Sequence, residues 1–313
     1  MLHKVTFLFF IFVQQIIADA HIFTYHRFND NKHSSTNTTL SQLKKDFDYL
    51  KSNNYEVIPF STLVNALKNN LEINNRWIVF HIDDSYKSFY KYGYKIFRKY
   101  NYPFTLFVYT ESANKNYGDY MRWEDIKEVS KFGEIALHSK NHPHLTKISN
   151  KEVIQDTQQA IKSFKKNMGY MPKYYVYPYG EYNDNVKNTI KSFGFESIGN
   201  QNLGAVSSQS DIFDLNRIAI SGKSDLSLHL KLKFLPAIWR NIKIDNQILK
   251  SLKIDIDPLI KNIQLFVSGY GWQKLKVKNG TISVSINKPL KKGRTRIFIK
   301  TYDNAINGKI IIL

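Results

Sequence analysis

The sequence predicts an α/β fold followed by a small all-β domain. Up to residue 236, short apolar runs typical of buried strands alternate with amphipathic segments of helical period. Such alternation favours parallel strands joined by helices in a barrel-like arrangement. Beyond Pro236 the apolar residues recur with a period of two between Gly and Asn turns, which is typical of short strands. We therefore expect a barrel over residues 21–236, a linker over 237–262 and a β domain over 263–313.

The barrel elements follow from the spacing of the apolar residues. In the first helix, Leu43, Phe47 and Leu50 share one face, and Thr39 or Ser41 can cap its start. Runs rich in β-branched and aromatic residues predict the strands. The helices are expected over residues 40–53, 59–68, 86–100, 123–131, 150–168 and 183–193. The strands are expected over residues 21–26, 55–58, 76–82, 104–109, 134–138 and 173–177.

The expected β domain is a set of short strands that could form a sandwich. Its strands are predicted over residues 264–268, 274–277, 281–286, 296–301 and 309–313. Asn279-Gly280 is a strong signal for a hairpin turn. Tyr270 and Trp272 could stack on sugar rings, or they could fill the small core of the domain. Strands this short are not stable alone, so we expect the domain to dock on the barrel.

The N-terminus predicts an exported protein. Lys4 precedes an apolar run, and Ala18-Asp19-Ala20 fits the small-x-small pattern of a signal-peptidase site. The interpretation is a signal peptide over residues 1–20 and a periplasmic or secreted protein. An uncleaved signal, which would leave the protein attached to the membrane, is the alternative.

The composition excludes some classes of function. The chain has no cysteine, so thiol nucleophiles and disulfides are excluded. Its net charge is +19, but the lysines are spread along the chain and no nucleic-acid-binding motif is present. We therefore expect no nucleic-acid partner. A basic surface could still hold the protein at anionic envelope polymers or lipid head groups.

A possible metal site follows from residues at the predicted strand ends. Asp83 and Asp84 end a buried strand, where two carboxylates are costly unless a cation compensates their charge. His138 ends another apolar run, and His142 lies four residues further on. Two histidines and a carboxylate can hold a divalent metal and leave positions open for substrate. A second carboxylate beside the metal can act as general base.

Three segments together resemble the polysaccharide deacetylases, the NodB-homology group or carbohydrate esterase family 4. They are Ile82-Asp83-Asp84-Ser85, the segment from His138 to Leu145 (HSKNHPHL) and Tyr177-Pro178-Tyr179-Gly180. The resemblance covers roughly residues 21–235. It implies a deformed (β/α) barrel of about seven strands.

The resemblance also implies roles for individual residues. Asp84, His138 and His142 would bind the metal, most often zinc. Asp83 would be the catalytic base, and the backbone N–H of Tyr179 would help to hold the oxyanion.

The sequence departs from the family pattern at several positions. His81 and Ile82 replace the usual Thr-Phe, and Val176 stands where the family has an arginine that steadies the base. Arg217 could replace that arginine. An early Tyr25-His26 strand end resembles the circularly permuted branch of the family, which includes poly-N-acetylglucosamine deacetylases. This resemblance favours His26 as general acid.

Further residues are candidates for binding the substrate. Tyr86, Tyr182 and Arg217 follow or flank the predicted strand ends, and aromatic faces bind sugar rings well.

The function that the resemblance implies is metal-dependent removal of N-acetyl groups from N-acetylhexosamine units of a polysaccharide. The partner would be an exopolysaccharide or cell-wall glycan. Two alternatives stay open at this point. One is a metal-dependent amidase or esterase with another acyl substrate, and the other is an inactive glycan-binding protein.

Overall fold

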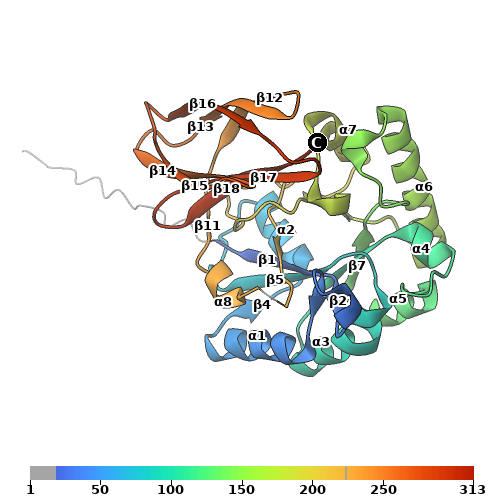
Figure 1. The fold of residues 1–313 in the computed structure, drawn as a ribbon. Coiled ribbons are helices and arrows are strands. Elements are labelled where there is room, and N and C mark those ends of the chain that lie inside the picture. Colours follow the sequence, from blue (N-terminus) through green and yellow to red (C-terminus); the bar gives the residue numbers. More distant parts are fainter. Residues whose placement is uncertain (1–18, 223) are drawn as a thin grey trace, which may run out of the picture.

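A parallel sheet forms the centre of the N-terminal part of the chain. The computed structural model describes residues 19–222 and 224–313 (Figure 1). The strands of the sheet run in the order β10-β1-β5-β6-β7-β8-β9, with β4 beside the start of β5, and every pair is parallel. The curved sheet is the expected deformed barrel. Its strands are β1 (His21–Tyr25), β4 (Glu56–Val57), β5 (Trp77–Ile82), β6 (Thr105–Val108), β7 (Glu134–Leu137), β8 (Tyr174–Val176), β9 (Ser197–Gly199) and β10 (Ile218–Ala219).

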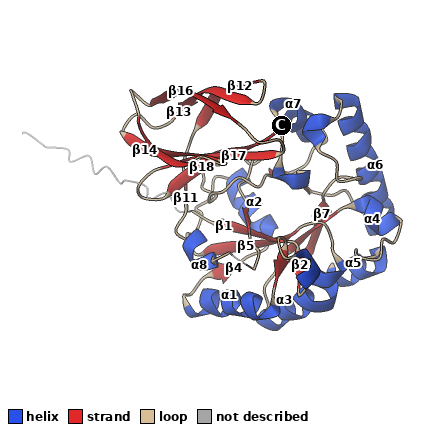
Figure 2. Ribbon diagram, in the orientation of Figure 1, coloured by secondary structure: helices blue, strands red, loops and turns tan. Residues whose placement is uncertain are grey.

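Most helices between the strands cover the outer side of this sheet, whereas α2 lies against its other face (Figure 2). Thr39 caps the first helix through its side chain, and Ser149 and Glu152 form a capping box at the longest one. The expected helix over residues 86–100 begins as a π-helical segment, η2 (Phe89–Gly93). The helices are α1 (Leu40–Ser52), α2 (Phe60–Lys68), α3 (Tyr94–Tyr100), α4 (Thr110–Asn114), α5 (Trp123–Val129), α6 (Asn150–Met168), α7 (Asp184–Lys191) and α8 (Leu226–His229).

Two apolar layers lie on the two faces of the parallel sheet. Phe23 and Phe80 belong to the cluster that the outer helices cover. Their neighbours Ile22 and Val79 belong to a second cluster, which α2 closes with Leu63 and other apolar side chains. Because successive side chains of a strand point to opposite faces, a sheet buried on both faces needs continuous apolar runs. This requirement explains why the barrel strands are apolar along their whole length.

The C-terminal part is a sandwich of two sheets, which are antiparallel except for the parallel pair β11 and β18. A three-stranded sheet has the order β12-β13-β16, and a five-stranded sheet has the order β11-β18-β17-β14-β15. The five-stranded sheet lies between the three-stranded sheet and the barrel (Figure 1). The strands are β11 (Lys233–Phe234), β12 (Ile238–Asp245), β13 (Ile248–Asp255), β14 (Asn262–Val267), β15 (Gly271–Lys276), β16 (Thr281–Pro289), β17 (Arg294–Lys300) and β18 (Ala305–Ile312).

Two details of the sandwich differ from the sequence prediction. Residues 237–262, expected as a linker, contain β12 and β13, whose Leu252 and Ile254 are buried in the sandwich core. Buried and exposed residues alternate along these strands, but the many polar residues that face solvent hide the apolar alternation in the sequence. Asn279-Gly280 does form a turn with positive φ at both residues. However, the turn joins strands of different sheets, because β15 pairs with β14 and β16 pairs with β13.

The beginning of the described chain is part of the fold. The N–H and C=O of Ala20 both bond to Val206, each at 2.8 Å. The Asp19 carboxylate accepts a hydrogen bond from the N–H of Phe234 at 3.2 Å. The rest of the expected signal peptide lies outside the described residues. Within the described ranges, no helix has the length and apolar character needed to cross a membrane.

Candidate active site

The predicted site residues meet at one end of the parallel sheet. His26 follows β1, Asp83 and Asp84 follow β5, and His138 follows β7. Tyr179 follows β8 in a short 3-10 turn, η4 (Pro178–Gly180). The carboxyl ends of parallel strands share one edge of the sheet, so residues far apart in sequence converge there.

Three potential metal ligands lie in contact. Oδ1 of Asp84 is 3.2 Å from Nε2 of His138 and 3.1 Å from Nε2 of His142. The two Nε2 atoms are 3.1 Å apart. Tetrahedral ligands at about 2.0–2.1 Å from a zinc ion are separated by roughly 3.3 Å. The spacing of these three atoms therefore fits a single small divalent cation.

The hydrogen bonds around His138 fix the direction of its lone pair. Its Nδ1 lies 2.9 Å from the carbonyl oxygen of Val176. A carbonyl can only accept, so Nδ1 carries the proton and Nε2 of the neutral ring presents a lone pair to Asp84. The same contact can form as an ion pair with a protonated ring, or around a cation that the carboxylate and the Nε2 lone pair bind together. The donor set therefore fits a metal, and the Val176 carbonyl is the outer partner that a ligating histidine usually has.

The loop that carries His142 is held in an unusual conformation. Within this loop Ser139 and His142 have positive φ, of 67° and 51°. Such conformations are costly for residues other than glycine and persist where the surroundings fix them. Asp156 of α6 does so here, because its carboxylate accepts the N–H groups of Lys140 and Asn141, each at 2.9 Å. Sequence reasoning did not find Asp156, since it lies in an ordinary amphipathic helix.

Arg217 holds Asp83 beside the three potential metal ligands. The guanidinium donates to both carboxylate oxygens, at 2.8 and 3.0 Å, and its Nε donates to the carbonyl of Asn200 at 2.6 Å. Both side chains are fully buried. Burial raises the pKa of Asp83, but the charges of Arg217, His138 and His26 and the hydrogen bonds from Arg217 together outweigh burial and lower the pKa to about 2. Arg217 therefore occupies the position expected for the replacement of the missing arginine, and it does not line the cleft as a substrate ligand.

Gly199 explains how Arg217 reaches this place. A Cβ atom on Gly199 would lie 2.9 Å from Cδ of Arg217 and 3.0 Å from its Nε. The long side chain thus passes over a strand residue that must lack a side chain.

His26 lies on the other side of Asp83. Its Nε2 is 4.0 Å from Oδ2 of Asp83, and the ring lines the cleft. Burial lowers the pKa of His26, and the charges of Asp84 and Asp83 oppose this effect.

The sequence comparisons agree with this geometry. The model of the family "Polysaccharide deacetylase" matches residues 72–198, a range that contains Asp83, Asp84, His138, His142 and Tyr179. The chain carries a polysaccharide deacetylase domain. It is 28% identical over 195 residues to a poly-beta-1,6-N-acetyl-D-glucosamine N-deacetylase of Staphylococcus aureus, an alignment that covers 58% of this chain and 67% of the relative.

Solved structures confirm the fold of the deacetylase domain. The Streptococcus pyogenes deacetylase PplD in complex with acetate superposes with a TM-score of 0.61 at 21% identity. That superposition covers 66% of this chain and 94% of PplD. IcaB from Ammonifex degensii gives a TM-score of 0.60 at 20% identity, over 68% of this chain and 96% of IcaB.

An open cleft of about 540 Å³ exposes the ligand cluster of the deacetylase domain. Tyr86, Tyr120 and Tyr179 line it, and the rings of Tyr86 and Tyr120 stack with centroids 4.8 Å apart. The Arg27 guanidinium lies 3.5 Å from the Tyr86 ring centroid and fixes this wall. The residues that form the cleft are His26, Ser35, Thr36, Asp84, Tyr86, Tyr120, His138, His142, Tyr179, Gln201, Ala219, Ile220, Ser221, Arg294 and Arg296.

Tyr182, the other aromatic candidate for substrate binding, lies outside the cleft lining of the deacetylase domain. Its hydroxyl donates to Asp214 at 2.5 Å and accepts from Lys309 at 2.6 Å. Its ring stacks on Tyr177. Tyr182 therefore joins the barrel to the β domain, and its expected contact with substrate stays a prediction.

Sequence reasoning missed Arg294 and Arg296, which reach the cleft of the deacetylase domain from β17. Nη2 of Arg294 donates to the carbonyl oxygen of Tyr179 at 2.6 Å. Alternation in Arg294-Thr295-Arg296 places both arginines on one face of a strand. The sequence contains no signal that this face meets the barrel.

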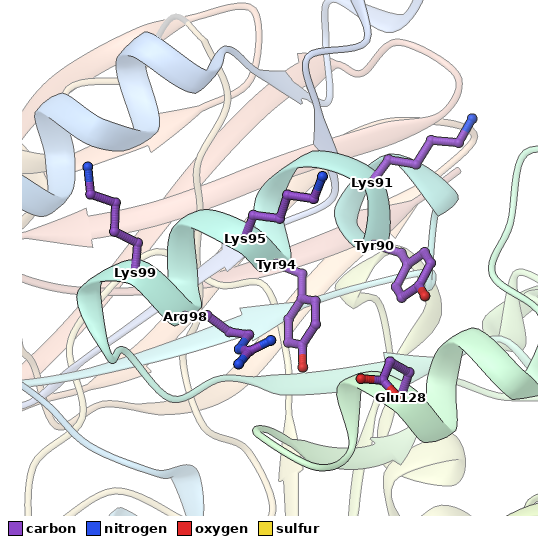
Figure 3. A pocket seen from close by; sticks show the side chains of 7 residues that line it. All are labelled: Tyr90, Lys91, Tyr94, Lys95, Arg98, Lys99 and Glu128. Carbon is purple, nitrogen blue, oxygen red and sulfur yellow. The ribbon is translucent and has the colours of Figure 1, made fainter.

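A second hollow, of about 720 Å³, lies over η2 and α3 (Figure 3). Lys91, Lys95, Arg98 and Lys99 give it a basic rim, and Glu128 of α5 faces them. It shares no lining residue with the cleft of the deacetylase domain.

Proposed function

We propose that the protein is a metal-dependent polysaccharide N-deacetylase that removes acetyl groups from N-acetylhexosamine units. The observation that carries the proposal is the buried Asp83–Arg217 pair directly beside the three-ligand cluster in an open cleft. A family of deacetylases matches the segment that holds the cluster. Zinc is the proposed ion, because two imidazoles and one carboxylate suit it.

Each site residue has a distinct proposed role in hydrolysis. A divalent cation held by Asp84, His138 and His142 would acidify water and polarise the amide carbonyl. Asp83 is ionised at neutral pH, so it can take the proton of the attacking water. His26 lies on the open side of Asp83 and is the proposed donor of a proton to the leaving amine. The backbone N–H of Tyr179 is the proposed oxyanion donor.

Arg217 contributes by holding the base in place. Two parallel hydrogen bonds fix both oxygens of Asp83 and prevent the carboxylate from turning toward the ligand cluster. Asp83 and Asp84 are adjacent in sequence, so this clamp keeps the base distinct from the ligand.

The test is acetate release from N-acetylglucosamine oligomers by the purified protein. We expect release that a chelator abolishes and added zinc or cobalt restores. Asp83→Asn should abolish release while the metal stays bound. Bound metal without acetate release from several linkages would point to another acyl substrate, whereas neither metal nor release would point to an inactive glycan-binding protein.

A further inference from the structure

One face of the five-stranded sheet carries basic side chains that lead away from the cleft. Arg294, Arg296 and Lys300 alternate along β17 with residues of the sandwich core, so they project from the same face. From Arg294 to Lys300 the strand spans about 20 Å. The first two of these residues line the cleft itself. We call these three residues, together with Trp272 and Lys274 of β15, the basic track.

The strand register places the β15 residues on the same face. Gln264 of β14 pairs with both Lys300 and Lys274. Likewise, Phe266 pairs with both Phe298 and Trp272. Directly opposed residues of neighbouring strands point to the same side of a sheet. The residues of the basic track therefore lie on one face of the sheet, on β17 and β15, with β14 between these two strands.

Trp272 gives the basic track an open aromatic face. Its side chain is 42% exposed, although its ring contacts Phe266 with a centroid distance of 5.3 Å. Nζ of Lys300 lies 5.0 Å from the Trp272 ring centroid. By contrast, the nearby Tyr270 is tied to the Pro289 carbonyl through its hydroxyl. A half-exposed indole beside cations suits a sugar ring that carries negative charge.

No carboxylate of the described residues lies within ion-pair distance of the arginines in the basic track. Arg27, Arg217 and Arg240 each form an ion pair with an aspartate. Within residues 19–222 and 224–313, neither Arg294 nor Arg296 has such a partner. Arg294 is half-buried and spends one N–H on the Tyr179 carbonyl, which leaves several of its five donors for a ligand. Burial lowers the pKa of Arg294, because the buried guanidinium charge is poorly solvated. An anion in the cleft would offset this loss of solvation.

The proposed reaction makes this charge distribution informative. Each hydrolysed N-acetyl group becomes an amine, which is protonated near neutral pH. A homopolymer of glucosamine would therefore gain positive charge next to Arg294 and Arg296 and be repelled. A polymer with anionic groups between its amino sugars would keep an attraction to the same surface.

We propose that the substrate is an anionic polysaccharide, with carboxylate or phosphate groups among its N-acetylhexosamine units, and that it binds along the basic track. This inference rests on the proposed deacetylase function and names the substrate class of that site. The anionic groups pair with Arg296 and Lys300, a sugar ring lies on Trp272, and an N-acetyl group of the same chain enters the cleft.

The experiment compares two fluorescent probes with equal numbers of rings. One is a hyaluronan oligosaccharide, which alternates N-acetylglucosamine with glucuronate, and the other is a neutral chito-oligosaccharide. Affinities are measured by anisotropy with the metal-loaded protein, at low and high salt. The test variant is Arg296→Gln/Lys300→Gln, and the matched control is Lys95→Gln/Lys99→Gln, which removes the same charge from the separate hollow in Figure 3.

We expect the anionic probe to bind more tightly, with a preference that falls at high salt. The test variant should weaken its binding roughly tenfold, whereas the control should not change it. Arg296→Lys should retain most of the affinity. Equal affinity for both probes, or equal losses in the two double variants, would overturn the inference.

Acetate release measured in the same samples separates this inference from the proposed function. One outcome is tight binding of the anionic probe that is lost in the test variant, without acetate release from any N-acetylated glycan. This outcome would contradict only the deacetylase proposal. Acetate release from neutral oligomers as fast as from anionic ones would contradict only the proposal of an anionic substrate.

Discussion

The barrel and the β domain contribute to the cleft in different ways. The barrel supplies buried residues that are paired with one another: Arg217 with Asp83, and Asp84 with two histidines. The β domain supplies Arg294 and Arg296, which have few partners and face the space where a polymer would lie. Paired, buried groups are suited to chemistry, whereas unpaired groups at the rim are suited to recognition. Substitutions in the two regions should therefore differ in which property they change.

The largest effect is expected from the base. Asp83→Asn should lower kcat for acetate release roughly 10²–10⁴-fold, because the amide cannot take a proton. Metal content, measured by atomic absorption, should stay at the wild-type level. His138→Ala should instead lose the metal together with activity. If His138→Ala still binds the metal, His138 is not a ligand, and the proposed separation of ligand and base residues is wrong.

A stability cycle tests the Asp83–Arg217 pair. Arg217→Met leaves a buried carboxylate without its partner and should lower the free energy of unfolding by about 3–5 kcal/mol. Asp83→Asn/Arg217→Met should recover much of that loss, since no charge stays buried alone. Urea unfolding of the four proteins gives the coupling energy. For comparison, Arg296→Gln in the β domain should change stability by less than about 0.5 kcal/mol.

Metal binding should stabilise the barrel. Zinc at a hundred times its Kd would raise the free energy of unfolding by about 2.7 kcal/mol, because the unfolded chain lacks the site. Calorimetry should show a higher Tm with zinc for the wild type, and no shift for Asp84→Asn. An Arg296→Gln protein should keep the full shift; losing it would mean that the β domain supports the ligand cluster as well.

The smallest effect concerns Asp46, another buried carboxylate of the barrel, which forms no ion pair within the described residues. Burial raises the pKa of Asp46 to about 6, although Gln42 and Tyr25 donate hydrogen bonds to it. The folded state therefore holds this proton more tightly than the unfolded state, and the stability that the proton contributes is lost as pH rises from about 4 to 6. Asp46→Asn should raise Tm above pH 7, and the gain should disappear below pH 4. A gain independent of pH would contradict this account, and the exposed Asp48→Asn serves as control.

The sequence predicted the barrel and the ligand cluster well for a physical reason. Strand runs buried on both faces are continuously apolar, and the polar residues at their ends stand out against them, as Asp83, Asp84 and His138 do. Arg217 was harder, since only the space over Gly199 brings it to Asp83. The surroundings of Tyr182 and Arg294 depend on how the two domains meet, whereas the strands within 237–262 were hidden by the polarity of that segment. A single strand's alternation shows which residues share a face, but not what covers that face.

The Ala20–Val206 pairing limits where a signal peptide could be cut if the chain is exported. Cleavage after Ala20 would remove two backbone hydrogen bonds and the Asp19 contact with Phe234. It would also create a charged α-amino group on His21, which is only 3% exposed. We therefore expect that export processing compatible with this fold cuts before Asp19, and mass spectrometry of the secreted chain would locate the cut. Asp19 and Ala20 would then stay in the protein and connect the beginning of the barrel to the start of the β domain.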